Sequence, residues 1–182
     1  MLQAANGARV VSLSSSGHRL SDVDFDDLNY RTRPYAPWPA YGQSKTANVL
    51  FAVGLTARYA EDGIFSNALM PGGIMTGLQK HVPYADQVKM GWFDEDGNPN
   101  PSFKTVEQGA STSVWAAVAP ELEGVGGRYL EDSAVAQPWN GEKPFSGYMP
   151  YAIDPQHADR VWELSEAAVA LRRWPPTSRA SC

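Results

Sequence analysis

Apolar residues along the chain fall into short runs and longer periodic stretches that follow one another in turn. The short runs contain β-branched residues and stop at polar or glycine-rich turns, which is typical of buried strands in a parallel sheet. These runs span residues 8–13, 64–70 and 126–130. The longer stretches predict helices over residues 40–60, 105–119 and 154–172.

Two of the predicted helices carry clear start signals. Thr105 stands three residues before Gln108, which is the spacing of a capping box. Asp154 is followed by Pro155, so an N-cap residue precedes a proline at the first helical position. The connections between elements are long, and we expect them to be extended or irregular over residues 17–39, 77–104 and 131–151.

The alternation of strands and helices predicts the α/β class with a parallel sheet. A chain of 182 residues can bury a core as one domain, so we expect a single domain over residues 1–182 with a polar tail at 173–182. Three strands are few for a doubly wound sheet, which usually has about six. We therefore expect only a part of such a sheet.

Composition and charge narrow the classes of function. The chain has 15 Lys and Arg against 20 Asp and Glu, and this net charge of −5 argues against a nucleic-acid binder. The only cysteine, Cys182, cannot form an internal disulfide. Residues 1–7 lack the pattern of a signal peptide, and no apolar run approaches the roughly 18 residues of a transmembrane helix. We expect a cytoplasmic protein.

Tyr41 and Lys45 are four residues apart near the start of the helix predicted at 40–60, and residues at this spacing share a helix face. A free phenol has a pKa near 10 and is a poor acid or base at pH 7. An ammonium about 4 Å away stabilises the phenolate by roughly 4 kcal/mol at an effective dielectric constant near 20. The pair therefore suits general acid–base catalysis, although an exposed polar pair on a helix explains the spacing equally well.

Two further segments end predicted strands at the same edge of the sheet. Ser15 follows the strand at 8–13, and residues 71–76 follow the strand at 64–70. Ligands bind at the carboxyl ends of parallel strands, where a hydroxyl can bond a substrate oxygen and glycines let the backbone approach a flat cofactor ring. Each segment alone is also an ordinary strand-ending turn. Together with Tyr41 and Lys45 they predict an active site.

These segments resemble the short-chain dehydrogenase/reductase family. The resemblance rests on residues 9–15 (RVVSLSS), on Tyr41-xxx-Lys45 and on residues 71–76 (PGGIMT). Within the family, the chain is most similar to the branch of retinol dehydrogenases and WW-domain oxidoreductases. The resemblance implies the C-terminal, catalytic part of a Rossmann-type, doubly wound parallel sheet, with the N-terminal strands missing.

The resemblance also implies roles for these residues. Ser15 would polarise the substrate oxygen, Tyr41 would donate or accept the proton, and Lys45 would assist Tyr41 and bind the nicotinamide ribose. The cofactor would be NAD or NADP, and the reaction would interconvert an apolar alcohol and its ketone or aldehyde by hydride transfer. The residues implied to contact the cofactor are Tyr41, Lys45, Pro71, Gly72, Gly73, Ile74 and Thr76.

The family's glycine-rich turn for the cofactor pyrophosphate has no counterpart here, because no G-x-G-x-x-G occurs in the sequence. We therefore expect weak NAD(P) binding by this chain. We also expect an unpaired apolar sheet edge at Val10 and Val11, through which the chain could associate with itself or another partner. The alternative to an oxidoreductase is a catalytically inactive fragment or interaction partner.

Residues 77–104 are a candidate substrate lid with Met90, Trp92 and Phe93 as its apolar contacts, although ordinary loop packing explains these residues about as well. Trp115 and Trp162 are predicted to be core residues. We expect no metal site, because the three histidines, His18, His81 and His157, do not have the spacing of metal ligands.

Overall fold

The computed structural model describes residues 1–5, 7–142 and 145–170, and the expected tail at 173–182 lies outside these ranges. Four strands form one sheet in the order β1-β2-β3-β4. They are Ala8–Leu13 (β1), Ile64–Met70 (β2), Tyr129–Glu131 (β3) and Ala134–Val135 (β4). The first three strands run parallel, and β4 is antiparallel to β3. The α/β class expected from the sequence is confirmed.

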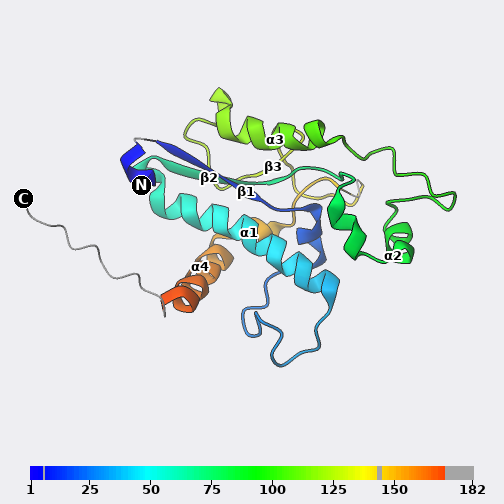
Figure 1. Ribbon diagram of the computed structural model, residues 1–182. Coiled ribbons are helices and arrows are strands. Elements are labelled where there is room, and N and C mark those ends of the chain that lie inside the picture. Colours follow the sequence, from blue (N-terminus) through cyan, green and yellow to red (C-terminus); the bar gives the residue numbers. More distant parts are fainter. Residues whose placement is uncertain (6, 143–144, 171–182) are drawn as a thin grey trace, which may run out of the picture.

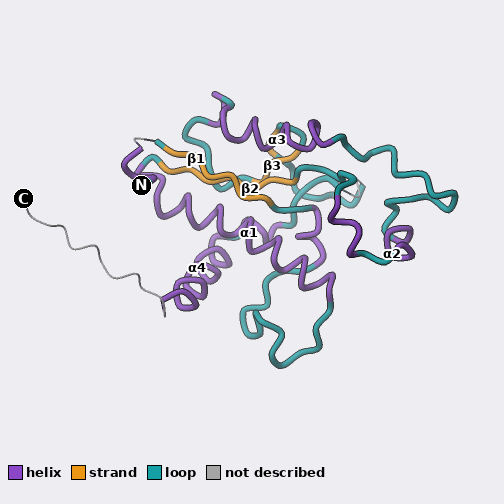
Figure 2. Tube along the Cα trace, in the orientation of Figure 1, coloured by secondary structure: helices purple, strands orange, loops and turns teal. Residues whose placement is uncertain are grey.

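The helices cover both faces of this sheet (Figure 1). They are Pro37–Tyr59 (α1), Tyr84–Lys89 (α2), Val106–Val118 (α3) and Pro155–Ala170 (α4). Helix α1 packs on one face and α3 on the other, while α4 lies against the outer side of α1, and the secondary-structure view shows the same layers (Figure 2). Each face has its own hydrophobic core, one under α1 around Val49 and Tyr129, the other under α3 around Leu69 and Leu130.

The third strand begins later than the sequence pattern predicts. Gly127 has a φ of +70°, a left-handed conformation that extended strand backbone cannot adopt, so β3 starts at Tyr129 instead of residue 126. The chain then turns back through Asp132 and Ser133, whose φ values are 50° and 54°. This turn adds β4, which the sequence analysis missed, and the expected all-parallel sheet is therefore mixed.

The segment 77–104 is more regular than expected. It contains a 3₁₀ helix, Gly77–His81, and the short helix α2. A capping box starts the first of these, because the Thr76 side chain accepts from Leu78 N while the Gln79 side chain accepts from Thr76 N. Thr76 and Gln79 have the same spacing as Thr105 and Gln108, but the sequence analysis did not use them to predict a helix.

The connection between β1 and α1 is organised by Asp27, which is nearly buried. Burial raises the pKa of this carboxyl, but hydrogen bonds from the backbone of Arg31, Thr32 and Arg33 and from the Thr32 hydroxyl outweigh that effect and lower the pKa to about 2. This carboxylate fixes the turn before α1, which begins at Pro37, three residues earlier than expected.

Candidate active site

The carboxyl end of β1 is bonded to both of its neighbours. Ser14 N donates to Leu69 O at 2.8 Å, which extends the pairing with β2 one residue beyond the strand. The Ser14 hydroxyl donates to Lys45 O at 2.8 Å, and the Ser12 hydroxyl donates to Asn48 O at 3.0 Å. These bonds fix the position of Ser15 relative to helix α1.

Ser15 caps a 3₁₀ helix, Ser16–Leu20, and its hydroxyl accepts from Gly17 N at 3.0 Å. A Cβ on Gly17 would lie 2.5 Å from Tyr41 Cε1 and 3.3 Å from Ser15 Oγ. The phenol ring and the serine hydroxyl therefore border the same point. A Cβ on Gly42 would lie 2.8 Å from Ser21 N, so this glycine lets α1 approach the 3₁₀ helix closely. The sequence analysis assigned no role to either glycine.

Lys45 lies one helical turn after Tyr41, and its ammonium is 5.6 Å from the centroid of the Tyr41 ring. Lys45 Nζ donates to Leu13 O at 3.4 Å, and Asn48 Nδ2 donates to the same carbonyl at 2.8 Å. Burial lowers the pKa of Lys45. Ser15, Tyr41 and Lys45 thus come together at the end of β1, on the side where Tyr41 and Lys45 leave α1.

The residues after β2 divide into two groups. Gly72 has a φ of +106°, which favours glycine, and the nearest atoms to a Cβ at Gly72 and Gly73 would be those of Lys104 and Phe103, at 2.6 and 2.7 Å. Pro71, Gly72 and Gly73 remain at the carboxyl end of the sheet next to β1.

Ile74 and Thr76 lie farther along and are engaged elsewhere. The tip of Ile74 occupies the space above Gly109 in α3, where a Cβ would clash with Ile74 Cδ1. Thr76 starts the 3₁₀ helix Gly77–His81 through its capping bond to Leu78 N. Of the residues implied to contact the cofactor, these two have side chains bound to other parts of the fold.

His18 is fully buried behind the site and was not among the expected site residues. Met149 N donates to His18 Nε2 at 3.1 Å, so the proton is on Nδ1, which donates to Ser15 O at 2.7 Å. Burial lowers the pKa of His18 to about 4. The Tyr151 hydroxyl donates to His18 O at 2.8 Å. This neutral imidazole connects the Ser15 turn to the segment that precedes α4.

Aromatic side chains extend from Tyr41 to the segment 77–104. The Trp38 ring is 6.4 Å from the Tyr41 ring with an interplanar angle of 86°, and 6.4 Å from the Trp92 ring at 90°. Phe93 contacts Tyr84 of α2 at 5.6 Å between ring centroids. The segment therefore reaches the site through Trp92, and its partner Trp38 was not among the residues expected there.

Comparison with known sequences shows which proteins this chain resembles. The chain is 47% identical over 171 residues to a probable oxidoreductase of Streptomyces antibioticus, an alignment that covers 92% of this chain and 57% of that protein. It is 39% identical over 159 residues to a short-chain dehydrogenase/reductase of Penicillium roqueforti, covering 87% and 46%. The chain belongs to the short-chain dehydrogenase/reductase family. It spans about half the length of the curated relatives it matches.

Three further comparisons concern a third sequence relative, a solved structure and family models. Polyprenol dehydrogenase of Mus musculus is 42% identical over 137 residues, which cover 72% of this short-chain dehydrogenase/reductase chain and 38% of that protein. The crystal structure of an uncharacterized protein from Mycobacterium paratuberculosis matches with a TM-score of 0.58 and 27% identity, over 90% of this chain and 51% of the other. No family model matches the chain.

Within residues 1–5, 7–142 and 145–170, no group of three or more His, Cys, Asp and Glu side chains is placed to hold a metal ion. In the same residues, none of the helices has the length and hydropathy needed to cross a membrane.

Proposed function

We propose that this chain carries the catalytic half of an NAD(P)-dependent oxidoreductase that interconverts an apolar alcohol and its ketone or aldehyde. The observation that carries the proposal is the convergence of Ser15, Tyr41 and Lys45 at the carboxyl end of β1. Oxidoreductases among the relatives support the class of reaction.

In the direction of reduction, the Ser15 hydroxyl donates a hydrogen bond to the substrate carbonyl oxygen and stabilises the charge that develops there. Tyr41 transfers its phenolic proton to the same oxygen, and the C=O double bond becomes a C–O single bond. The Lys45 ammonium stabilises the phenolate that remains. Oxidation runs through the same groups in reverse, with Tyr41 as the base.

The bound nicotinamide supplies the hydride in reduction and accepts it in oxidation. The residues present fit this end of the cofactor, because Tyr41, Lys45 and the backbone of Pro71 to Gly73 surround the end of β1. The pyrophosphate end is different, since the sequence has no G-x-G-x-x-G. We therefore expect this chain to bind NAD(P) weakly.

A turnover assay tests the proposal. The oxidation of NADPH or NADH, at millimolar concentration because affinity is expected to be weak, is followed with 2-acetylnaphthalene as an apolar ketone. Tyr41→Phe should lower the rate by about 10²- to 10⁴-fold, the usual contribution of general acid–base catalysis. Tyr35→Phe is the matched control, since Tyr35 is 69% exposed and outside the site.

The outcomes separate the parts of this proposal. Unchanged turnover by Tyr41→Phe excludes Tyr41 as the acid–base. Tight binding of NADPH by a monodisperse monomer contradicts the expectation of weak cofactor binding. Absence of turnover with a range of apolar ketones, even at saturating cofactor, contradicts catalysis by this chain.

A second candidate function is association through β1. In the described parts of the chain β1 pairs only with β2, and none of its residues is fully buried. Ala8 N and Ser14 N donate toward β2, so the N–H groups of alternate residues, Val11 among them, face the outer edge. An edge of this kind can accept a strand of another chain.

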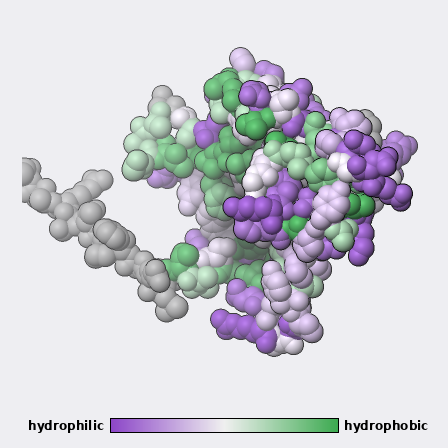
Figure 3. Space-filling view, turned by 45° about the vertical axis from the view of Figure 1, so that its right-hand side comes forward, coloured by the Kyte–Doolittle hydropathy of each residue, from purple (hydrophilic) through white to green (hydrophobic). Residues whose placement is uncertain are grey.

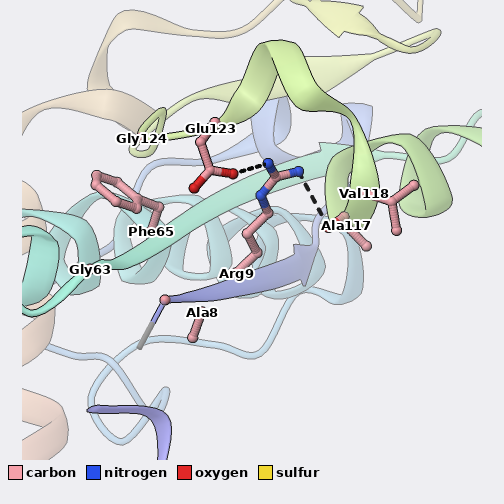
Figure 4. Close-up of a pocket in the computed structure, with 9 residues that line it drawn as sticks. Ala8, Arg9, Gly63, Phe65, Ala117, Val118, Glu123 and Gly124 are labelled. Atoms are coloured by element: carbon pink, nitrogen blue, oxygen red, sulfur yellow. Dashed lines mark hydrogen bonds and ion pairs between the residues drawn. The ribbon is translucent and has the colours of Figure 1, made fainter. Parts of the chain in front are cut away.

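Surfaces beside this edge are also open. A cavity of about 480 Å³ lies at the amino end of β1, bordered by Ala8, Phe65 and Val118 (Figure 4). Helix α3 exposes Val114 and Val118, and hydrophobic residues lie among hydrophilic ones in the upper part of the space-filling view (Figure 3). These apolar contacts would add to the pairing of strands.

Val11→Pro tests association directly. Proline removes an outward N–H without removing a bond to β2, and edge strands tolerate it. If the chain associates through this edge, light scattering after size-exclusion chromatography should show a smaller mass for Val11→Pro than for the unmodified chain. An equal mass for the two proteins excludes this edge as the contact.

A further inference from the structure

The Trp38 ring lies next to Tyr41 and the Trp92 ring lies next to Trp38, and the proton transfer itself explains neither of them. Trp38 lies three residues before Tyr41 on α1, so the two side chains share a helix face. Its ring meets Tyr41 nearly perpendicularly and meets Trp92 in the same way. Trp38 and Trp92 are both only partly buried, so part of each residue is accessible to a bound molecule.

The position of Trp92 is fixed by its own backbone. Trp92 N donates to Gln87 O at 2.9 Å, and Asn100 N donates to Trp92 O at 2.8 Å. Gln87 is buried and its side chain donates to Val82 O at 2.8 Å. Lys104 N donates to Gly73 O at 2.8 Å, which ties the far end of the segment to the residues after β2. Trp92 thus belongs to a segment with a hydrogen-bonded structure of its own, and the end of this segment at Lys104 is bonded to Gly73 beside the site.

The substrate's orientation follows from these positions. Ser15 and Tyr41 bind the reacting oxygen in the proposed function, so the carbon skeleton next to that oxygen must lie beside Tyr41. Trp38 is the aromatic neighbour of Tyr41, and Trp92 continues the surface away from it. Edge-to-face ring pairs are a favoured geometry and accept a further flat ring at their open faces.

We propose that Trp38 and Trp92 determine substrate specificity by binding a planar, unsaturated group attached to the reacting carbon. This inference rests on the proposed function, because it takes Tyr41 as the place of the reacting oxygen. It names the substrate class as aromatic or conjugated apolar ketones, aldehydes and alcohols, in preference to saturated ones of the same size.

The test uses two ketones with the same carbon skeleton, planar 2-acetylnaphthalene and saturated 2-acetyldecahydronaphthalene. Each is titrated into the ¹⁵N-labelled chain, without cofactor and again with millimolar NADPH, and the indole N–H signals are followed by NMR. Substituting each tryptophan with phenylalanine assigns its signal. We expect the Trp38 and Trp92 signals to shift with the planar ketone, while that of Trp162, which stacks on Phe51 away from Tyr41, stays in place.

Affinity then gives the decisive comparison. Trp38→Leu and Trp92→Leu keep an apolar side chain but remove the flat ring, and each should weaken binding of the planar ketone by roughly two- to tenfold. Neither should change the affinity for the saturated ketone, and Trp162→Phe should change neither. Circular dichroism identifies any variant that does not fold, in which case the indole shifts of the unmodified chain decide.

Equal affinity for the two ketones, or shifts confined to other indoles, would overturn the inference. Absence of binding by both ketones under both conditions would overturn it as well. These readouts need no hydride transfer, so they differ from a failure of the proposed function. Specific binding at Trp38 and Trp92 without turnover would support the role of these two residues in substrate binding and contradict the proposed catalysis.

Discussion

The carboxyl end of β1 and its outer edge differ in how completely the rest of the chain surrounds them. At its carboxyl end, Ser12 and Ser14 bond the strand to α1, and Ser14 also bonds it to β2. Along its outer edge the described residues supply no strand, and the side chains stay partly exposed. Apolar residues occur along the whole of β1, at Ala8, Val10, Val11 and Leu13, so its neighbours and not its own pattern decide which part is fixed.

The burial of β1 and β2 also shows that the neighbours of a strand decide how far it is covered. They are parallel and paired in register from Ala8 with Ile64 to Leu13 with Leu69. All but one residue of β2 are buried, whereas none of β1 is. β1 has the sequence pattern of a buried strand but its residues are partly exposed, and this shows where the sheet can be extended.

The largest effect should come from acid. Because burial lowers the pKa of His18 from 6.5 to about 4, the unfolded chain takes up a proton between these values that the folded chain does not. Stability should therefore be complete above pH 6.5 and fall as the pH drops toward 4, by about 3 kcal/mol. Urea unfolding at several pH values measures this slope.

His18→Gln provides the control for the acid effect. Its stability should change much less between pH 6.5 and 4, since the other titrating groups remain and only the buried imidazole is gone. The carboxyl of Asp27, with a pKa of about 2, loses its contribution at lower pH and does not obscure this window. Parallel slopes for the two proteins would show that His18 is not the titrating group.

A smaller effect is expected from added volume between α1 and the Ser15 turn. Gly42→Ala would place a Cβ 2.8 Å from Ser21 N, and we expect a loss of about 2 kcal/mol in unfolding free energy, as is usual for overpacking. Gly54→Ala is the matched control on the same helix, because its Cβ would meet nothing closer than 3.4 Å. Alanine in a helix interior should stabilise that variant by about 0.5–1 kcal/mol.

Thermal or urea unfolding of the two alanine variants measures the difference in their stability. If Gly42→Ala is as stable as Gly54→Ala, the close approach of α1 to the Ser16–Leu20 helix is not tight. The same variants sharpen the comparison of activity, since only the Gly42 variant should move Tyr41 relative to Ser15.

The smallest effect on the unfolding free energy is expected at the ion pair of Arg9, which lies in β1. Arg9 pairs with Glu123 at 2.7 Å, but the Glu123 side chain is 85% exposed (Figure 4). Glu123→Gln should cost less than about 1 kcal/mol, as exposed ion pairs usually do, because Arg9 keeps its bond to Ala119 O. Unfolding in urea measures it, and a loss above 2 kcal/mol would mean that this part of β1 is as firmly held as the carboxyl end.

The sequence was most informative where local chemistry decides the structure. The apolar runs predicted the bounds of β1 and β2 correctly, and the capping box of Thr105 and Gln108 starts α3 as expected. Trp115 and Trp162 were expected to be core residues, but both are only partly buried: Trp115 packs against the edge of the cluster under α3, and Trp162 stacks on Phe51.

Features that depend on distant contacts were missed for a physical reason. Gly127 adopts a left-handed conformation that the apolar residues after it do not indicate, so the predicted start of β3 was too early. The returning strand β4 was not predicted. The partners of His18 and Trp38 are Met149 and Trp92, far away in the sequence, and no local pattern relates them. The roles of the predicted site residues stay predictions until turnover is measured.

Ser15, Tyr41 and Lys45 all lie between β1 and β2, within one β–α–β unit of the chain. Contacts within such a unit are close in sequence, and units of this kind tend to open and close as a whole in native-state hydrogen exchange. The backbone amides of β2 and the buried face of α1 should therefore lose protection together. The three groups proposed to be catalytic would be assembled or dispersed in one event, whether or not a partner covers the outer edge of the sheet.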